Sequence, residues 1–169
     1  GWEVLQHALD AVQERGGSRV DLVGGEPLMH RRIEDLLADA RARGLRVTVT
    51  TNGLRLADAA FAARVLPQLD ALVISLHGAD EDSYAEATRN PDGFAALRRA
   101  LAVVRERPAD LPLIVNTTLG GDLVERLPRL LQLVHRVSPA AWHVTFPFPV
   151  GAAEAAYARV APALARVAR

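Results

Sequence analysis

The chain has 169 residues, half of them apolar, and its 20 acidic residues balance 20 basic ones, so the formal net charge is zero. This composition is typical of one globular domain over residues 1–169, and no basic face indicates a nucleic-acid partner. The sequence contains no lysine and no cysteine. These absences exclude P-loop and Schiff-base lysine chemistry, disulfides and, within these residues, thiolate ligands for an iron–sulfur cluster. No apolar run approaches the roughly 18 residues of a membrane span, so we expect no membrane partner and a cytoplasmic location.

Apolar spacing predicts helices and strands that alternate along the whole chain. Such alternation, with connections long enough for βαβ units, indicates a parallel sheet with helices outside it. The chain opens on a helix, so the strand that should come before that helix is missing. The expected strands are Arg19–Val23, Leu45–Thr50, Ala71–Leu76, Pro112–Thr118 and Ala141–Phe146. The expected helices are Trp2–Arg15, one carrying Ile33, Leu36, Leu37 and Ala40 and ending near Gly44, Ala57–Leu66, one starting near Asp80 and ending before Arg89, Phe94–Arg107, Leu123–Val137 and Ala152–Ala168.

Polar residues recur on one parity of several predicted strands. Strands buried on both faces of a doubly wound sheet should be apolar at both parities. A lumen that is polar at the carboxyl ends of the strands instead predicts a barrel, in which the site lies at those ends. The alternative is that serine and threonine simply favour strands, which does not explain the histidines and asparagines. The polar residues of shared parity are Thr48, Thr50 and Asn52; Ser75 and His77; Asn116 and Thr118; and His143 and Thr145.

The segment Arg19–His30 reads R-V-D-L-V-G-G-E-P-L-M-H, a short apolar strand that ends at two glycines, a carboxylate and a proline. Gly24 and Gly25 allow unusual backbone angles and close approach of a ligand to main-chain groups. Glu26 adds an anion that suits a bound ammonium, and Pro27 stops the strand. A phosphate is a poor fit, because the loop lacks a P-loop or dinucleotide pattern and carries a negative charge. The alternative is a simple strand-to-helix turn.

G-G-E-P-L, followed by T-T-N-G at Thr50–Gly53 and by I-S-L-H-G at Ile74–Gly78, closely resembles the core of the radical S-adenosylmethionine (SAM) enzymes. The resemblance implies a partial (β/α)6 TIM-like barrel of parallel strands that begins after its first strand. It also implies that the G-G-E-P segment binds the SAM amino group. The family's C-x-x-x-C-x-x-C loop, which holds a [4Fe-4S] cluster, is absent, so we expect the cluster ligands to lie outside this chain. A truncated chain explains this departure in one step, and a degenerate, cluster-free relative is the alternative.

By this resemblance, the whole protein would cleave SAM reductively to a 5′-deoxyadenosyl radical that abstracts hydrogen from a peptide or a small metabolite. An electron donor such as flavodoxin or ferredoxin would be its partner, and this chain alone would be inactive. Ser75, Arg89 and Asn116 each have a structural alternative: a backbone-bonded serine, a solvated surface arginine and a buried amide. The expected SAM-binding residues are Gly24, Gly25, Glu26, Pro27, Asn52, Ser75, Arg89 and Asn116, and the expected substrate-binding residues are Thr50, His77 and His143.

Two other functions are compatible with the sequence. His30, His77 and His143 lie at or near strand ends and could hold a hydrolytic metal ion, although no paired histidine motif supports such a ligand set. The chain could also be a SAM-binding or scaffold domain that has lost its cluster.

Overall fold

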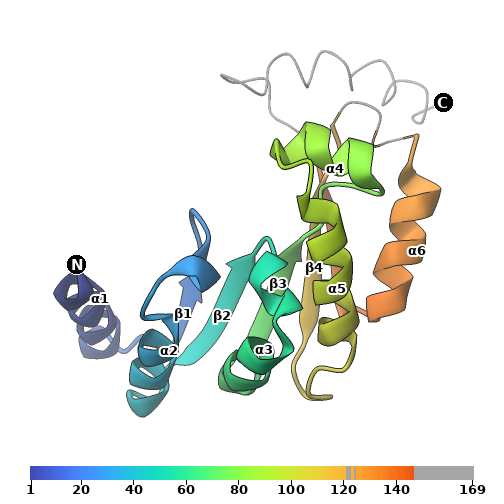
Figure 1. Cartoon of the computed structure of the whole chain (residues 1–169). Coiled ribbons are helices and arrows are strands. Elements are labelled where there is room, and N and C mark those ends of the chain that lie inside the picture. The colour runs from blue at the N-terminus through green and yellow to red at the C-terminus, as the bar shows by residue number, and fades with distance from the viewer. Residues whose placement is uncertain (121–122, 124, 147–169) are drawn as a thin grey trace.

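The computed structural model describes residues 1–120, 123 and 125–146 (Figure 1). The expected helix Ala152–Ala168 lies outside these residues. The helices are α1 (Trp2–Glu14), α2 (Ile33–Ala42), α3 (Ala59–Val65), α4 (Glu81–Thr88), α5 (Gly93–Arg105) and α6 (Leu127–Val137). The strands are β1 (Arg19–Leu22), β2 (Arg46–Thr51), β3 (Ala71–Ser75), β4 (Leu113–Thr118) and β5 (Ala141–Thr145), and short 3₁₀ turns cover Pro27–Met29, Leu54–Ala57 and Leu66–Gln68.

The five strands form one parallel sheet in the order β1-β2-β3-β4-β5. Each of β1, β2, β3 and β4 is followed along the chain by helical structure that returns to the start of the next strand, so the sheet grows in one direction. Within the described residues β1 and β5 are its two edges and do not pair with each other. The parallel strands with helices between them confirm the expected α/β fold.

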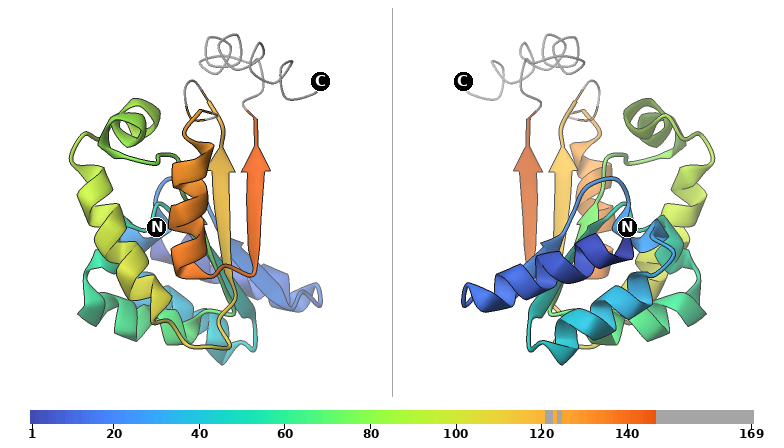
Figure 2. Two further views of the ribbon diagram at one scale, coloured as in Figure 1. Left: turned by 90° about the vertical axis from the view of Figure 1, so that its right-hand side faces the viewer. Right: turned by 90° about the vertical axis from the view of Figure 1, so that its left-hand side faces the viewer.

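The two faces of this sheet differ in burial. Helices α2, α3, α5 and α6 lie over one face (Figures 1 and 2). Most strand residues on that face are apolar and form the core with the helices, and the buried Thr51 and Thr117 share the face near the ends of β2 and β4. Because adjacent side chains alternate between faces, the polar residues of opposite parity lie on the face without these helices. The fully buried strand residues are Val47, Val49, Leu72, Ile74, Leu113 and Val115, each 0% exposed.

Two helices start later than the sequence predicts, and local chemistry explains both. The helix expected from Ala57 begins at Ala59, because the carboxylate of Asp58 accepts hydrogen bonds from the N–H groups of Ala60 (3.0 Å) and Phe61 (3.1 Å). The helix expected from Leu123 begins at Leu127. Proline occupies its first turn, where the missing N–H costs no hydrogen bond.

In the part of the chain that the structure describes, no helix combines the length and the apolar character needed to cross a membrane.

Candidate functional site

The loop after β1 has the backbone that its glycines predict. Gly24 and Gly25 have φ angles of +83° and +44°, in the left-handed region that favours glycine. Both are exposed, and a Cβ at either position would meet no atom within 4 Å. The space beside these two residues is therefore open to a ligand, while Pro27 starts the following 3₁₀ turn.

Glu26 joins the loop after β1 to the loop after β2. Its Oε1 accepts hydrogen bonds from the Thr51 hydroxyl (2.6 Å) and the Leu28 N–H (3.1 Å), and its Oε2 accepts one from the Asn52 N–H (2.7 Å). A carboxylate has about four acceptor positions, two on each oxygen. Three are used by the protein, so one position on Oε2 remains for an outside donor.

The predicted Thr51-Asn52-Gly53 turn is present. The Thr51 hydroxyl oxygen accepts a hydrogen bond from the Gly53 N–H (3.0 Å), and the Asn52 side-chain oxygen accepts one from the Leu54 N–H (2.9 Å). Gly53 has a φ of +78°. The Asn52 side-chain oxygen thus shapes the turn, and its amide nitrogen is the part of the side chain left for a ligand.

Three of the expected site residues form one row across the sheet. Ser75 on β3 is in register with Asn116 on β4, and Asn116 is in register with His143 on β5. The Asn116 Oδ1 atom is buried and has no hydrogen-bond partner among the described residues. The side chains of Ser75 and His143 also make no hydrogen bond to any described residue, so all three residues of the row have polar atoms that could bind a ligand. Thr50 on β2 lies on the same face, in register with Val73, two residues before Ser75.

His77 lies just beyond β3 and is already engaged. Its Nδ1 accepts a hydrogen bond from the Thr118 N–H (3.3 Å), which links the ends of β3 and β4. Burial lowers the pKa of His77 below its usual value, favouring the neutral imidazole that can accept this bond. Only Nε2 is left for another partner.

Asp80 holds the start of α4 against α6. Its carboxylate accepts hydrogen bonds from the Ser83 N–H (3.0 Å), from Arg126 (2.5 and 2.6 Å) and from Arg129 (2.9 Å). Burial opposes ionisation of this carboxyl, but the hydrogen bonds from Arg126 and Ser83 outweigh it and hold its pKa well below the usual range. Asp80 thus caps the N-terminus of α4 and also forms ion pairs with Arg126 and Arg129.

Tyr84 on α4 is a residue near the site that the sequence analysis missed. It is 3% exposed, and its ring packs against Phe94 with centroids 5.9 Å apart. Burial raises the pKa of Tyr84, and the negative charge of Glu26 adds to the shift. The available signal was the glycine pattern, because a Cβ at Gly78 or Gly93 would lie 2.4–2.5 Å from Tyr84 atoms.

Arg89 ends α4 in the left-handed conformation, with a φ of +57°. It is exposed and forms no ion pair with any described residue, so its guanidinium is free to meet an anion. A non-glycine residue at positive φ is uncommon and directs the side chain away from the path a helix would give it.

The structure does not bring the three candidate metal-binding histidines together. His30 Nδ1 accepts a hydrogen bond from the Arg32 N–H (3.2 Å), His77 binds Thr118, and His143 stands exposed on β5. Over the described residues no three histidine, aspartate or glutamate side chains are grouped so as to hold a metal ion. The geometry gives no support to a histidine-metal hydrolase.

The sequence profile of the radical SAM superfamily matches residues 2–134. The chain belongs to the radical SAM superfamily. Two curated radical SAM relatives of this chain are enzymes with different reactions. The AdoMet-dependent heme synthase of Methanosarcina barkeri is 27% identical over 146 residues, covering 86% of this chain and 41% of that protein. The GTP 3′,8-cyclase of Mycolicibacterium smegmatis is 36% identical over 128 residues, covering 72% of this chain and 35% of that protein. The chain spans less than half the length of these relatives.

Solved structures agree on the fold. SuiB of Streptococcus suis bound to S-adenosylmethionine superposes with a TM-score of 0.66 at 19% identity, over 87% of this chain and 34% of that one. The structure of anSMEcpe with bound AdoMet and Kp18Cys peptide superposes with a TM-score of 0.69 at 14% identity, over 88% of this chain and 44% of that one. The radical SAM fold that the sequence motifs predicted is confirmed.

The radical SAM family uses SAM and a [4Fe-4S] cluster, and the residues of this chain suit one of these groups and not the other. The open acceptor position on Glu26 and the unpartnered Oδ1 of Asn116 suit a ligand with an ammonium and hydrogen-bond donors, as SAM has. A [4Fe-4S] cluster needs thiolates, and this chain has no cysteine. Residues 1–169 therefore fit SAM and do not by themselves fit the cluster.

Proposed function

We propose that the protein to which this chain belongs is a radical SAM enzyme and that the chain supplies its SAM-binding wall. The observation that carries the proposal is the fourth acceptor position of Glu26, which faces no described donor and lies beside two unobstructed glycines. An ammonium group donates three hydrogen bonds. One goes to Glu26 Oε2, and the backbone carbonyls of Gly24 and Gly25 take the others.

The polar residues around this loop are assigned to the rest of the SAM molecule. Arg89 has a free guanidinium, which suits bidentate pairing with the SAM carboxylate. Ser75 and Asn116 lie side by side on the face without helices and have unused hydrogen-bonding atoms. They bind the ribose hydroxyls or the adenine edge, while the Asn52 amide and Pro27 shape the mouth of the loop.

The hydrogen-donating substrate is assigned to the same face of the sheet. His143 extends the Ser75–Asn116 row toward β5, and Thr50 lies on the opposite side of it. Nε2 of His77 is the third candidate contact. When SAM is bound to a [4Fe-4S] cluster and receives one electron, it supplies a 5′-deoxyadenosyl radical that removes a hydrogen atom from the substrate. What these residues contribute is orientation of SAM and substrate and exclusion of water.

The cluster and the electron donor lie outside residues 1–169 in this proposal. We infer that three cysteines elsewhere in the protein hold the cluster and that a flavodoxin- or ferredoxin-type protein delivers the electron. A peptide or a small metabolite is the substrate class. Support for both classes comes from relatives and neighbours: one is a heme synthase, another a GTP cyclase, and anSMEcpe binds a peptide.

The proposal is tested on the complete protein, purified without oxygen and supplied with iron, sulfide, SAM and a strong reductant. The expected result is 5′-deoxyadenosine that disappears on Glu26→Ala. A matched control is Glu34→Ala, because the Glu34 carboxylate on α2 pairs with Arg64 and not with a residue of the Gly-Gly-Glu loop. No product from the wild-type protein would overturn the radical chemistry and leave a SAM-binding domain without a cluster.

A binding measurement tests the residue assignment separately from turnover. Methylthioadenosine has the adenosine of SAM but neither its ammonium nor its carboxylate. Glu26→Ala and Arg89→Ala are expected to weaken SAM binding and to leave methylthioadenosine binding unchanged, whereas Asn116→Leu is expected to weaken both. Equal losses for the two ligands in the Glu26 variant would show that the carboxylate does not contact the ammonium.

A further inference from the structure

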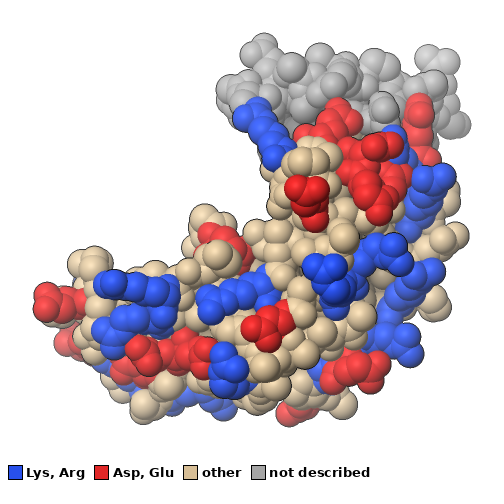
Figure 3. Space-filling model, viewed as in Figure 1, with Lys and Arg blue, Asp and Glu red and all other residues tan. Residues whose placement is uncertain are grey.

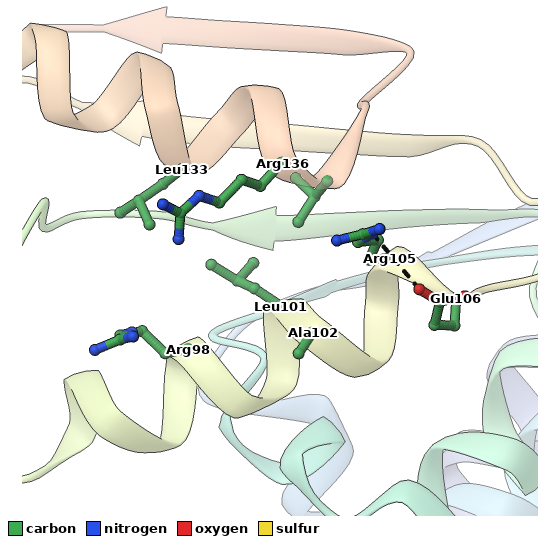
Figure 4. A pocket seen from close by; sticks show the side chains of 8 residues that line it. Arg98, Leu101, Ala102, Arg105, Glu106, Leu133 and Arg136 are labelled. Atoms are coloured by element: carbon green, nitrogen blue, oxygen red, sulfur yellow. Dashed lines mark ion pairs between the residues drawn. The ribbon is translucent and has the colours of Figure 1, made fainter.

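A groove runs between α5 and α6 on the outer surface of the sheet. One part of it has a volume of about 310 Å³ and is drawn in Figure 4. Its floor is apolar: Leu101 and Val137 are buried, and Leu133 is half-buried. The side chain of Arg98 projects from α5 and that of Arg136 from α6, on the two sides of the groove (Figure 4).

A second hollow, of about 280 Å³, continues the groove toward the start of α4. The two hollows share Arg98, Leu133 and Arg136, so these residues mark the centre of one continuous surface. We name this surface the α5–α6 groove. It lies on the helical side of the sheet, opposite the polar face assigned to SAM (Figure 1).

The α5–α6 groove is held open at both ends. At one end Arg107, just after α5, donates hydrogen bonds to the carbonyls of Val137 (2.9 Å) and Ser138 (2.9 Å) at the end of α6. At the other end Asp80 accepts hydrogen bonds from Arg126 and Arg129 at the start of α6. Arg107 thus joins α5 to α6 at one end, and the Asp80 contacts, which border the second hollow, join α4 to α6 at the other, so a ligand meets a preformed surface.

The charge of the groove is unbalanced at its centre. Arg105 pairs with Glu106 (3.5 Å) and Arg129 pairs with Asp80 (2.9 Å). Arg98 and Arg136 form no ion pair with any residue in the described part of the chain. Figure 3 shows basic side chains gathered along the α5–α6 side of the molecule. Glu81 lines only the second hollow, at the α4 end, so the positive charge is concentrated at the centre of the groove. Two unpaired guanidinium groups beside a leucine floor suit a ligand that is apolar in the middle and anionic on both sides.

We propose that the α5–α6 groove docks an acidic segment of a partner protein. An apolar side chain of that segment packs on Leu101 and Leu133, and carboxylates on either side of it pair with Arg98 and Arg136. A small anion would pair with the arginines and make no use of the apolar floor between them. A nucleic acid would need a longer basic surface than this neutral chain offers. Charge complementarity and the apolar floor together favour an amphipathic acidic segment.

The probe for this proposal is a short helical peptide with one leucine flanked by glutamates a helical turn away on each side. Its binding to the complete protein is measured by fluorescence anisotropy. The charge-reversal variant Arg98→Glu with Arg136→Glu is compared with a control, Arg99→Glu with Arg46→Glu. The control arginines are exposed, lie outside the groove and change the net charge equally. Urea midpoints verify that both variants are folded.

The peptide is expected to bind the wild type and the control similarly and the groove variant at least about tenfold more weakly, because two attractive contacts become repulsive. Binding is also expected to weaken as salt rises and when serine replaces the peptide's leucine. Equal binding to the groove variant, or equal binding of a peptide with lysines for glutamates, would overturn the proposal. Displacement of the peptide by inorganic phosphate, with no loss on replacing its leucine, would also overturn it and indicate a small-anion site.

Discussion

Replacing Glu26 by glutamine tests whether this carboxylate holds two loops together. The wild-type side chain accepts three hydrogen bonds, from the Thr51 hydroxyl, the Leu28 N–H and the Asn52 N–H. Glutamine has one oxygen and one NH₂ group in the same space. Whichever way its amide is turned, the NH₂ group faces a backbone N–H. Glu26→Gln therefore loses at least one hydrogen bond and places two donors against each other.

The magnitude follows from the kind of bond that is lost. A hydrogen bond to a charged group contributes about 1.5–3 kcal/mol, so Glu26→Gln should lower the free energy of unfolding by about that amount. For a chain of this length, 1 kcal/mol corresponds to about 2–4 °C in Tm, which gives an expected decrease of about 3–12 °C. The interaction with Thr51 is isolated by a double-mutant cycle with Thr51→Val, for which we expect a coupling of about 1 kcal/mol or more.

The assay is urea and thermal unfolding of the four proteins of the cycle, with Glu34→Gln as the matched control. Glu34 pairs with Arg64 on the surface, where its side chain is 40% exposed and solvent screens the interaction. The control should therefore unfold close to the wild type. A Glu26 variant as stable as the Glu34 variant, or no coupling to Thr51, would refute the loop-joining role.

Three further perturbations have defined outcomes. Gly78→Ala should cost at least about 2 kcal/mol in unfolding experiments, because the new Cβ would lie 2.4 Å from the backbone of α4; Gly120→Ala, which meets no atom within 4 Å, is its control. Asp80→Ala should cost about 2–4 kcal/mol through the lost cap and the lost charged hydrogen bonds, whereas Asp92→Ala, at an N-cap without a side-chain hydrogen bond, should cost under about 0.5 kcal/mol. Equal losses in either pair would contradict these assignments. Burial lowers the pKa of His77, so the unfolded chain protonates first and stability should fall as the pH drops through about 6.5. His77→Gln should flatten that part of a stability–pH curve, and an unchanged curve would argue against the buried neutral imidazole.

Local patterns in the sequence were enough for the architecture. The alternation of apolar spacing predicted five parallel strands with helices between them, and the parity of Thr50, Ser75, Asn116 and His143 predicted which sheet face carries polar groups. Both succeed because side-chain period and helix spacing are local properties that burial acts on directly. The helix starts at Ala59 and Leu127 were missed by several residues, because capping by Asp58 and proline competes with apolar spacing there.

The Gly-Gly-Glu-Pro segment shows which contacts the sequence could not predict. Its residue types predicted an open, anionic loop after a buried strand. The positive φ angles of Gly24 and Gly25 agree with the open loop, but the strand is not buried, because the residues of β1 are exposed or half-buried. That Glu26 also holds the loop after β2, that Tyr84 lies within reach of its charge, and that Arg126 reaches back 46 positions to Asp80 came only from the tertiary structure. Such contacts join residues far apart in the chain, and no local propensity encodes which partner a charged side chain finds. Sequence alone therefore determined the kind of fold and the face of the sheet that carries polar groups, and packing decided which acceptor positions are left for a ligand.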